Sequence, residues 1–439
     1  MSLPFVAVVG RPNVGKSTFV NRITHTEDAI VHEMRGVTRD RSYHKADWNG
    51  VEFMLIDTGG ITMGESDRFQ KSITSQALMA CEEADCIVFL VDGRTGVTDE
   101  DAEVAKVLKR SEAPVLLAVN KMDDPTDDEA IWQFYSLGIG EPYPVSSVHG
   151  NGTGDLLDEV VARLPKNARD EEDPDQLNVA IIGRPNAGKS SLTNRLVGEE
   201  RCIVSEVAGT TRDAIDTVVE HDGKSYRIVD TAGMRRKSQI DEDVEYYGFV
   251  RALRAIERAQ VVLLMIDASL GLTDQDQHVA RVACDAGCSM VILVNKWDLV
   301  TDPERRDDVL QDVEEKMVFV NYAHVLTISA LTGRSVYRVW DAIDAANAAY
   351  NRRISTSKLN AFLTDLRDFG LTVSKGGKRL RLNYVTQTDV CPPEFTFFGN
   401  CPEIVDDNYR RFLENRLRSS FDLKGTPIRL KFKRKNSRD

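Results

Sequence analysis

Two copies of one eight-residue pattern, G-x-x-x-x-G-K-S, constrain this chain more than any other feature. The first copy runs from Gly10 to Ser17 and the second from Gly183 to Ser190. Each follows a short apolar run and precedes a stretch of helical character, the context that a phosphate-binding loop needs. In such a loop, backbone N–H groups turn inward around a phosphate, and the helix N-terminus adds partial positive charge. The sequence therefore predicts two sites for a nucleoside triphosphate.

Every residue of the two loops is a candidate nucleotide ligand. The lysine is expected to reach the β- and γ-phosphates, and the serine after it to offer its hydroxyl to Mg²⁺. The first loop consists of Gly10, Arg11, Pro12, Asn13, Val14, Gly15, Lys16 and Ser17, and the second of Gly183, Arg184, Pro185, Asn186, Ala187, Gly188, Lys189 and Ser190.

Further motifs recur in the same order behind each loop. Thr38-Arg-Asp returns at Thr211, and Asp57-Thr-Gly-Gly returns as Asp230-Thr-Ala-Gly. The tetrapeptides Asn120-Lys-Met-Asp123 and Asn295-Lys-Trp-Asp298 follow, and then Ser146 and Ser329. The spacing between copies grows only from 173 to 183 residues, so the insertions are small and belong in loops. The chain therefore contains a tandem duplication of one domain.

Apolar runs alternate with amphipathic stretches inside each copy, a pattern typical of a mostly parallel sheet covered by helices. Expected buried strands are Phe5–Val9, Phe53–Ile56, Ile87–Val91 and Val115–Val119, then Val179–Ile182, Tyr226–Val229, Val261–Ile266 and Met290–Val294. We predict two α/β phosphate-loop domains, at 1–165 and 177–350, joined by an exposed acidic linker at 166–176.

A smaller α+β domain is predicted at 351–439. Its expected elements are a helix at 357–368, strands at 379–386 and 394–398, a helix at 406–421 and a strand at 427–433. Leu380, Leu382 and Tyr384 are expected to share one face of the first strand. This domain carries 19 Lys and Arg against 10 Asp and Glu, whereas the rest of the chain carries 37 against 59. A basic domain on an acidic body favours contact with nucleic acid.

Membrane and secreted classes receive no support from the composition. The longest apolar runs, such as Val261–Ile266, have only strand length, and no leader precedes the first strand. The seven cysteines form no C-x-x-C pair or zinc pattern. We therefore expect a cytoplasmic protein, monomeric in solution and without membrane contact.

The N-K-x-D tetrapeptides select the base. An aspartate at the carboxyl edge of the sheet can accept from N1–H and from the N2 amino group of guanine, and adenine lacks that amino group. Asn120 and Asn295 are expected to face the other edge of the purine. The lysines are expected to brace the base against the phosphate loop, and the loops at Ser146 and Ser329 to close over it. The predicted base-site residues are Asn120, Lys121, Met122, Asp123 and Ser146, with Asn295, Lys296, Trp297, Asp298 and Ser329.

The remaining motifs are predicted to serve Mg²⁺ and the γ-phosphate. Asp57 and Asp230 would hold the metal through water, and the glycine at the end of each motif would reach the γ-phosphate. Thr38 and Thr211 are candidate switch threonines, with the alternative that each only caps a loop. The residues concerned are Thr38, Asp57, Thr58, Gly59, Gly60 and Ile61, with Thr211, Asp230, Thr231, Ala232, Gly233 and Met234.

With these motifs the whole chain resembles the Der (EngA) bacterial GTPases, which have two tandem G domains and a C-terminal KH-like domain. The resemblance implies GTP hydrolysis to GDP in assembly of the large ribosomal subunit, with contact to ribosomal RNA. Ile61 and Met234 stand where Ras-like enzymes carry a water-orienting glutamine. By resemblance, Asn13 and Asn186 would instead help to hold a K⁺ ion, so we predict potassium-stimulated hydrolysis.

Several alternatives stay open at this level. One G domain could bind nucleotide without turnover, as a sensor or structural module. The basic run Met234–Ser238 could be a solvated face, an RNA contact or a docking point for the third domain. A tRNA-modification GTPase is disfavoured, because its C-terminal C-x-G-K is missing. The third domain lacks the G-x-x-G loop of RNA-binding KH modules, so it could bind RNA by its basic face or serve as a platform for the switches.

Overall fold

The structure is a computed structural model that describes residues 3–24, 43–57, 77–78, 80–81, 84–123, 131–165, 176–198, 203–208, 215–229, 252–368, 374–375 and 378–434. The chain divides into two compact units, Met1–Asp170 and Glu171–Asp439. The first unit holds one phosphate-loop domain, and the second holds the other together with the C-terminal domain. No helix among the described residues is long and apolar enough to cross a membrane.

A six-stranded sheet forms the centre of the first unit, in the order β2-β3-β1-β4-β5-β6. Only β2 runs antiparallel to its neighbour. All six strands are short, and those in the middle are buried on both faces, as parallel strands between helices must be. The strands are β1 (Phe5–Val9), β2 (Tyr43–Trp48), β3 (Val51–Asp57), β4 (Cys86–Asp92), β5 (Val115–Asn120) and β6 (Pro142–Pro144).

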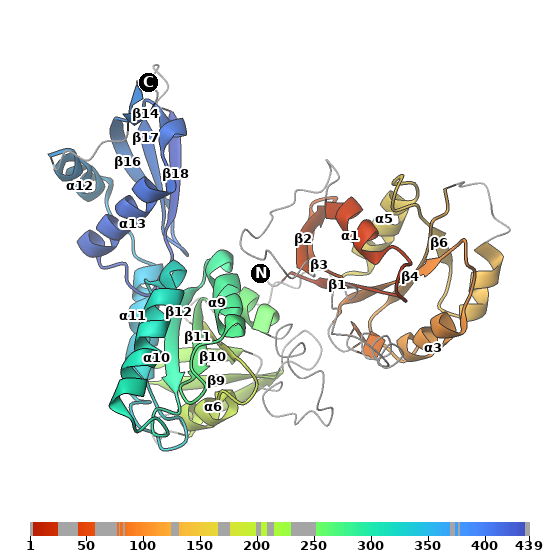
Figure 1. The fold of residues 1–439 in the computed structure, drawn as a ribbon, viewed down its shortest axis with the longest axis horizontal. Helices are drawn as coiled ribbons and strands as arrows, with labels where there is room; N and C mark the ends of the chain where they lie inside the picture. Colours follow the sequence, from red (N-terminus) through yellow and green to blue (C-terminus); the bar gives the residue numbers. More distant parts are fainter. Residues whose placement is uncertain are drawn as a thin grey trace. The chain divides into compact units, whose positions relative to one another are not determined.

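Helices cover both faces of this sheet (Figure 1). Alternate strand residues pack with α1 (Lys16–Thr24) and α5 (Thr153–Arg163) on one face. The others pack with α3 (Asp99–Leu108) and the 3₁₀ turn Gln133–Leu137 on the opposite face. A capping box formed by Thr98 and Asp101 starts α3 and satisfies its first N–H groups.

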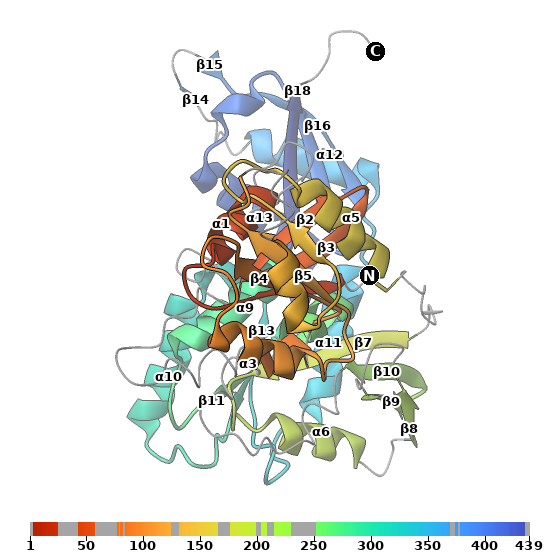
Figure 2. The same ribbon diagram turned by 90° about the vertical axis from the view of Figure 1, so that its right-hand side faces the viewer.

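The second phosphate-loop domain repeats this plan in a seven-stranded sheet, in the order β13-β12-β11-β7-β10-β9-β8. Figure 2 shows the extra strand β8 at the free edge, next to β9. The strands are β7 (Gln176–Gly183), β8 (Ile203–Ala208), β9 (Ile215–His221), β10 (Lys224–Val229), β11 (Val261–Asp267), β12 (Ser289–Asn295) and β13 (His324–Thr327), and the helices are α6 (Lys189–Val197), α9 (Asp274–Ala286), α10 (Pro303–Lys316) and α11 (Arg338–Tyr350). The predicted α/β fold class is confirmed for both copies.

The C-terminal domain has the predicted α-β-β-α-β order and its own core. It contains α12 (Thr356–Asp368), β16 (Leu382–Asp389), β17 (Glu394–Gly399), α13 (Asp407–Phe421) and β18 (Arg429–Arg434), with a short ladder of β14 (Ser374–Lys375) and β15 (Lys378–Arg379). β16 pairs antiparallel and β18 parallel with β17.

One expectation for this domain is wrong. Leu380 and Leu382 are buried, but Tyr384 is exposed. The pairing of β16 with β17 shifts between Leu382 and Tyr384, so the strand gains one residue at this irregularity. Because side chains alternate with a period of two, one extra residue moves every later side chain to the other face. Val385 and Gln387 therefore point inward instead.

The C-terminal domain is fastened to the second phosphate-loop domain by backbone hydrogen bonds. Gly425 donates to the carbonyl of Tyr322 (2.7 Å) and accepts from the N–H of Met290 (2.9 Å). Arg418 stacks on the Tyr322 ring at 4.8 Å and donates to the carbonyl of Thr426. Met290 lies at the start of β12, whereas the N-K-x-D motif lies at its other end. The attachment is therefore at the edge of the sheet remote from the phosphate loop.

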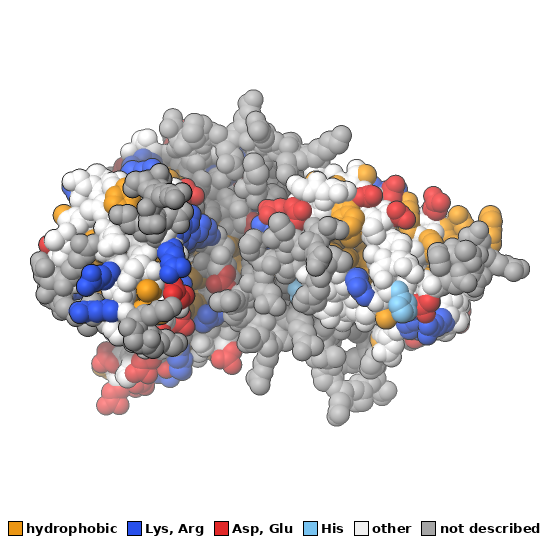
Figure 3. Space-filling model, turned by 90° about the horizontal axis from the view of Figure 1, so that it is seen from above, with side chains coloured by type: hydrophobic (Ala, Val, Ile, Leu, Met, Phe, Trp, Pro, Cys, Tyr) orange, Lys and Arg blue, Asp and Glu red, His pale blue; other side chains and the backbone are white. Residues whose placement is uncertain are grey.

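Basic side chains line the outer side of β18. Arg429, Lys431 and Lys433 are exposed, while Leu430 and Phe432 pack against the core of the domain. Lys431 also pairs with Glu394 at 2.8 Å. In Figure 3 this domain lies on the left of the picture, where several Lys and Arg side chains face the viewer.

Candidate nucleotide sites

Each phosphate loop connects the first parallel strand of its domain to a helix. The backbone of Asn13 and Gly15 is left-handed, with φ of +66° and +99°, and Asn186 and Gly188 repeat this at +62° and +101°. A Cβ on Gly15 would stand 2.5 Å from Nδ2 of Asn120, so no side chain fits there. Both loops thus have the concave backbone geometry of an anion site.

The loop lysines point back at carbonyls of their own loops. Lys16 donates to Gly10 (2.7 Å) and Arg11 (2.9 Å), and Lys189 donates to Gly183 and Arg184, both at 2.7 Å. Burial lowers the pKa of both lysines, that of Lys189 to about 8, although a nearby carboxylate opposes the shift in each case. A γ-phosphate would supply the negative charge that these buried ammonium groups lack.

Ser17 and Asp57 meet at the mouth of the first loop, where the Ser17 hydroxyl donates to Oδ2 of Asp57 at 2.8 Å. The structure therefore brings together two of the predicted magnesium ligands from positions 40 residues apart. One hydroxyl and one carboxylate leave most of an octahedral shell to phosphate oxygens and water, as Mg²⁺ prefers. The described residues contain no cluster of three acidic, His or Cys side chains that could hold a metal without those oxygens.

Asn120 and Asn295 link the base motif to the phosphate loop. The Asn120 amide donates to the carbonyl of Val14 (2.7 Å), and its oxygen accepts from the N–H (3.0 Å) and hydroxyl (2.8 Å) of Ser147. Asn295 donates to Ala187 (2.7 Å) and accepts from the N–H of Ala330 (2.9 Å). Each amide thus bridges loops that converge here, as a buried polar group requires. One N–H of each amide is used in this way, and the expected contact with the purine stays a prediction.

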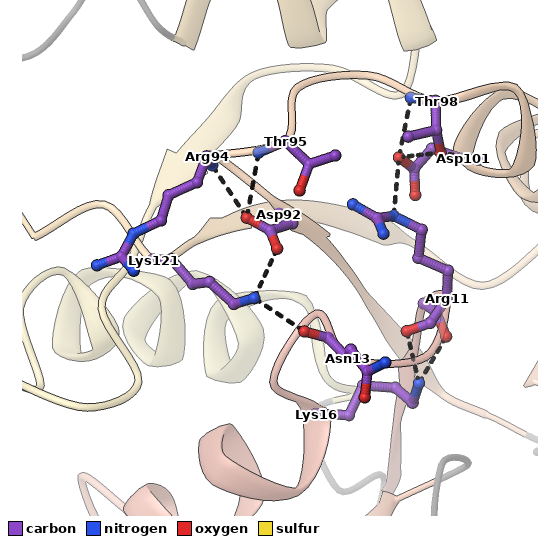
Figure 4. A network of polar contacts seen from close by, with 10 residues as sticks. Arg11, Asn13, Lys16, Asp92, Arg94, Thr95, Thr98, Asp101 and Lys121 are labelled. Atoms are coloured by element: carbon purple, nitrogen blue, oxygen red, sulfur yellow. Dashed lines mark hydrogen bonds and ion pairs between the residues drawn. The ribbon is translucent and has the colours of Figure 1, made fainter.

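The lysines of the two motifs bond a carboxylate at the end of the neighbouring strand, and Lys121 also contacts the phosphate loop. Lys121 donates to the carbonyl of Asn13 (2.9 Å) and to Asp92 (2.6 Å), as Figure 4 shows. Lys296 makes the corresponding bond to Asp267 at 2.5 Å. Burial opposes ionisation of Asp92 and Asp267, but the lysine hydrogen bonds keep the pKa of both below the usual range.

Met122 and Trp297, the variable residues of the two motifs, are core side chains. Met122 is 7% exposed and packs with α3, and Trp297 is 8% exposed with Arg306 stacked on its ring at 5.4 Å. Both side chains therefore help to fix the motif in the core, and a contact of either residue with nucleotide stays a prediction.

The two aspartates predicted to read the base have different surroundings. Asp123 accepts from the Ser146 hydroxyl (2.8 Å) and from Arg94, and these bonds hold the pKa of Asp123 below its usual range. In the second copy Ser269 takes the place of Arg94, and Oδ1 of Asp298 is buried without a hydrogen-bond partner. A buried, unpaired carboxylate oxygen fits the donors of a guanine edge.

An ion pair that the motifs did not reveal joins the first phosphate loop to α3. Nε of Arg11 lies 3.5 Å from Oδ2 of the fully buried Asp101, as Figure 4 shows. In the second copy the charge of Arg184 acts on Asp276, which also completes a capping box with Thr273. The sequence signal for this contact is the recurrence of an arginine and an aspartate at nearly equal spacing, 90 positions in the first copy and 92 in the second.

Several predicted site residues lie outside the described residues, so their roles stay predictions. They are Thr38, Thr58, Gly59, Gly60 and Ile61 in the first copy and Thr211, Asp230, Thr231, Ala232, Gly233 and Met234 in the second.

Comparison with known proteins agrees with this duplicated site. The family model described as "50S ribosome-binding GTPase" matches twice, at residues 5–121 and 178–296. The model described as "KH-domain-like of EngA bacterial GTPase enzymes, C-terminal" matches 353–433. A GTPase Der from Moorella thermoacetica is 50% identical over 100% of both chains. The chain belongs to the Der GTPase family.

Further Der relatives match along nearly the full length. The Heliobacterium modesticaldum protein is 49% identical over 98% of both chains, and a Listeria monocytogenes protein is 47% identical over 98% of this chain and 99% of its own. As a Der GTPase the chain binds guanine nucleotides and hydrolyses GTP, and its two G domains and KH-like domain are those of the family.

Proposed function

We propose that this Der GTPase is a double GTP switch in the cytoplasm that acts in assembly of the large ribosomal subunit. The description of the family model, which names 50S ribosome binding, supports this role. The exposed basic strand β18 supports a contact between the KH-like domain and ribosomal RNA. Contacts of this kind are dominated by phosphate charge and weaken steeply with salt.

The observation that carries the switch proposal is the equivalence of the two nucleotide sites. In both copies the loop lysine bonds the same two carbonyls, the motif asparagine bonds the same loop residue, and the motif lysine bonds the matching aspartate. This frame, repeated in both copies, supports nucleotide binding at both sites. In each, the γ-phosphate would hold Thr38 or Thr211 and the glycine of the following motif, Gly60 or Gly233, and hydrolysis would release them.

We further propose Mg²⁺ at Ser17 and Asp57, with Ser190 and Asp230 as the matching pair, and K⁺ beside Asn13 and Asn186. Both asparagines are exposed at left-handed turns of the phosphate loops, which supports a role at the nucleotide. GTP turnover measured in potassium and in sodium buffers of equal ionic strength tests the potassium site. Faster turnover in potassium is expected, and equal rates would refute it.

Ribosome-fraction sedimentation tests the assembly role. We expect the full chain to co-sediment with large-subunit particles in a non-hydrolysable GTP analogue and to leave them in GDP. The charge-reversed variant Lys433→Glu should lower co-sedimentation, while Lys316→Glu, on α10 of the second G domain, serves as the control. Identical sedimentation in both nucleotides would contradict the proposal.

A second candidate function is that only one G domain hydrolyses GTP. The first copy has Arg94 where the second has Ser269, and this difference favours different roles for the two sites. Lys16→Ala and Lys189→Ala, measured separately at saturating GTP, distinguish the two ideas. Two active sites predict partial loss of turnover in each variant. Complete loss of GTP turnover from one substitution alone would support hydrolysis by only one of the two G domains.

A further inference from the structure

An arginine on the helix after each phosphate loop reaches across to the loop that begins at Ser146 or Ser329. In the first copy, Arg22 on α1 donates from Nε to the carbonyl of Ser147 at 3.1 Å and from Nη2 to that of Val148. In the second, Arg195 on α6 donates to the carbonyl of Leu331 at 2.6 Å. The bonds join residues 125 to 136 positions apart, and the arginines correspond in the repeat.

These two loops have the same internal construction. Ser146 donates to the carbonyl of Asn151 (2.9 Å) and accepts from the N–H of Gly150 (2.6 Å). Ser329 makes the equivalent bonds with Arg334 (3.1 Å) and Gly333 (2.8 Å). Gly150 and Gly333 have φ of +85° and +84°, so both loops turn at a left-handed glycine.

Apolar packing does not hold the tips of these loops. Val148 is 61% exposed and Leu331 is 76% exposed. In the second copy a pocket lies between α6 and the loop at Ser329. It is lined by Ser191, Asn194, Arg195, Gly198, Ala330 and Leu331. Each loop is instead held at its start by the motif asparagine, and at its tip by the arginine.

We propose that Arg22 and Arg195 are positioning residues that hold the base-covering loops against the helices of the phosphate loops. A loop fixed at both ends presents a preorganised cover to the base, and preorganisation lowers the entropy cost of binding. A loop released at its tip opens more often, so the nucleotide leaves faster. The proposal rests on the role in base binding predicted above for the loops at Ser146 and Ser329.

The experiment uses the full chain with the two sites made distinguishable. Asp123→Asn replaces an acceptor by an amide that can donate to the O2 atom of xanthine, so the first site should prefer xanthine and a labelled GDP should report the second site alone. Asp298→Asn does the reverse. Arg195→Gln is then made in the Asp123→Asn chain and Arg22→Gln in the Asp298→Asn chain, and dissociation of labelled GDP is followed.

Removal of each arginine should raise the GDP dissociation rate about fivefold to tenfold, the loss expected for one or two hydrogen bonds from a charged donor. Turnover at saturating GTP should stay within about twofold, because neither side chain reaches the phosphates. Lysine at either position should recover part of the effect, since it donates to a single carbonyl. Arg163→Gln and Arg227→Gln are matched controls, since those arginines bond Glu159 and Gln176 instead.

Three results would count against this assignment in different ways. Unchanged dissociation rates in chains that do switch to xanthine overturn the role of the arginines alone. Faster dissociation that comes with an equal loss of turnover and a lower melting temperature indicates a merely structural role. Failure of Asp123→Asn and Asp298→Asn to change base preference overturns the base assignment beneath the proposal.

Discussion

Arg94 donates a hydrogen bond to Asp123, the carboxylate predicted to read guanine in the first G domain. The arginine comes from the turn after β4 and the aspartate from the end of the N-K-x-D motif, 29 positions later. A guanine bound at this carboxylate would compete with an internal partner. The second domain has Ser269 at the matching position, where the hydroxyl bonds Asp267 at 2.6 Å, and Oδ1 of Asp298 has no hydrogen-bond partner.

We expect Arg94→Ser to tighten GDP binding at the first site and Ser269→Arg to weaken it at the second. Both partners of the ion pair are solvent-accessible, so each change should be about twofold to fivefold. Titration of labelled GDP at low and high salt provides the measurement. The effect should shrink with salt, and a change in the opposite direction would show that Arg94 supports the base instead.

Nucleotide binding at the second site should depend on pH near 8. The pKa of Lys189 is about 8 because burial penalises the ammonium group, and phosphate charge will raise it. Binding above pH 8 therefore takes up a proton, and affinity falls as pH rises. Calorimetry of GDP binding in two buffers of different ionisation enthalpy measures this uptake, and Lys189→Ala should abolish it.

The same lysine affects folding in the opposite direction. A depressed lysine pKa means that the unfolded chain holds more protons than the folded domain between about pH 8 and the ordinary value of 10.5. The nucleotide-free domain should thus gain stability from this group as pH rises through that window. Urea unfolding of the wild type and of Lys189→Met at pH 7.5 and 9.5 isolates the contribution of Lys189 to the free energy of unfolding. If the wild type gains no more stability between these pH values than the variant does, the prediction is wrong.

Asp101→Asn should destabilise the first G domain by about 1–3 kcal/mol, because it removes the charge that faces Arg11 inside the protein. Asparagine keeps an oxygen for the bonds from Thr98, so the helix cap survives and the loss reports the ion pair. Denaturant unfolding is the measurement, with Glu103→Gln, exposed on the same helix, as the control. Equal stability of both variants would mean that the pair contributes nothing.

Gly425→Ala should loosen the KH-like domain from the second G domain. Gly425 has φ of +92°, and a Cβ there would stand 2.9 Å from Cα of Ala346. Backbone strain and the clash together should cost at least about 2 kcal/mol. Gly223→Ala is the matched control, since Gly223 has φ of +76° but open space around it, and should cost about 1 kcal/mol.

Limited proteolysis follows the separation of the KH-like domain, and thermal unfolding gives the loss of stability. Gly425→Ala is expected to accelerate cleavage near residue 351, whereas Gly223→Ala is not. Equal behaviour of the two variants would show that the close approach to Ala346 is not what holds the domains together.

The elements of the fold were predictable from the sequence where a short segment encodes both its own conformation and its function. The conformation of each eight-residue loop is encoded in the loop itself. In the first loop Asn13 and Gly15 adopt the left-handed conformation, and the lysine comes directly after them. The predicted strand cores agree with the observed strands to within a few residues, because runs buried on both faces have few other places to go. Tyr384 broke the pattern, since an irregular strand pairing cannot be read from alternation alone.

By itself, the sequence determined that this chain has two guanine-nucleotide sites, because phosphate cradle and base-reading carboxylate are carried by short motifs whose order and spacing recur. Only the tertiary structure decided what those motifs touch. It paired Arg94 with Asp123, aimed Arg22 and Arg195 at the base-covering loops, and engaged the Asn120 amide within the protein. Such contacts depend on how far and in which direction a side chain reaches across the edge of a sheet, and no local pattern encodes that direction.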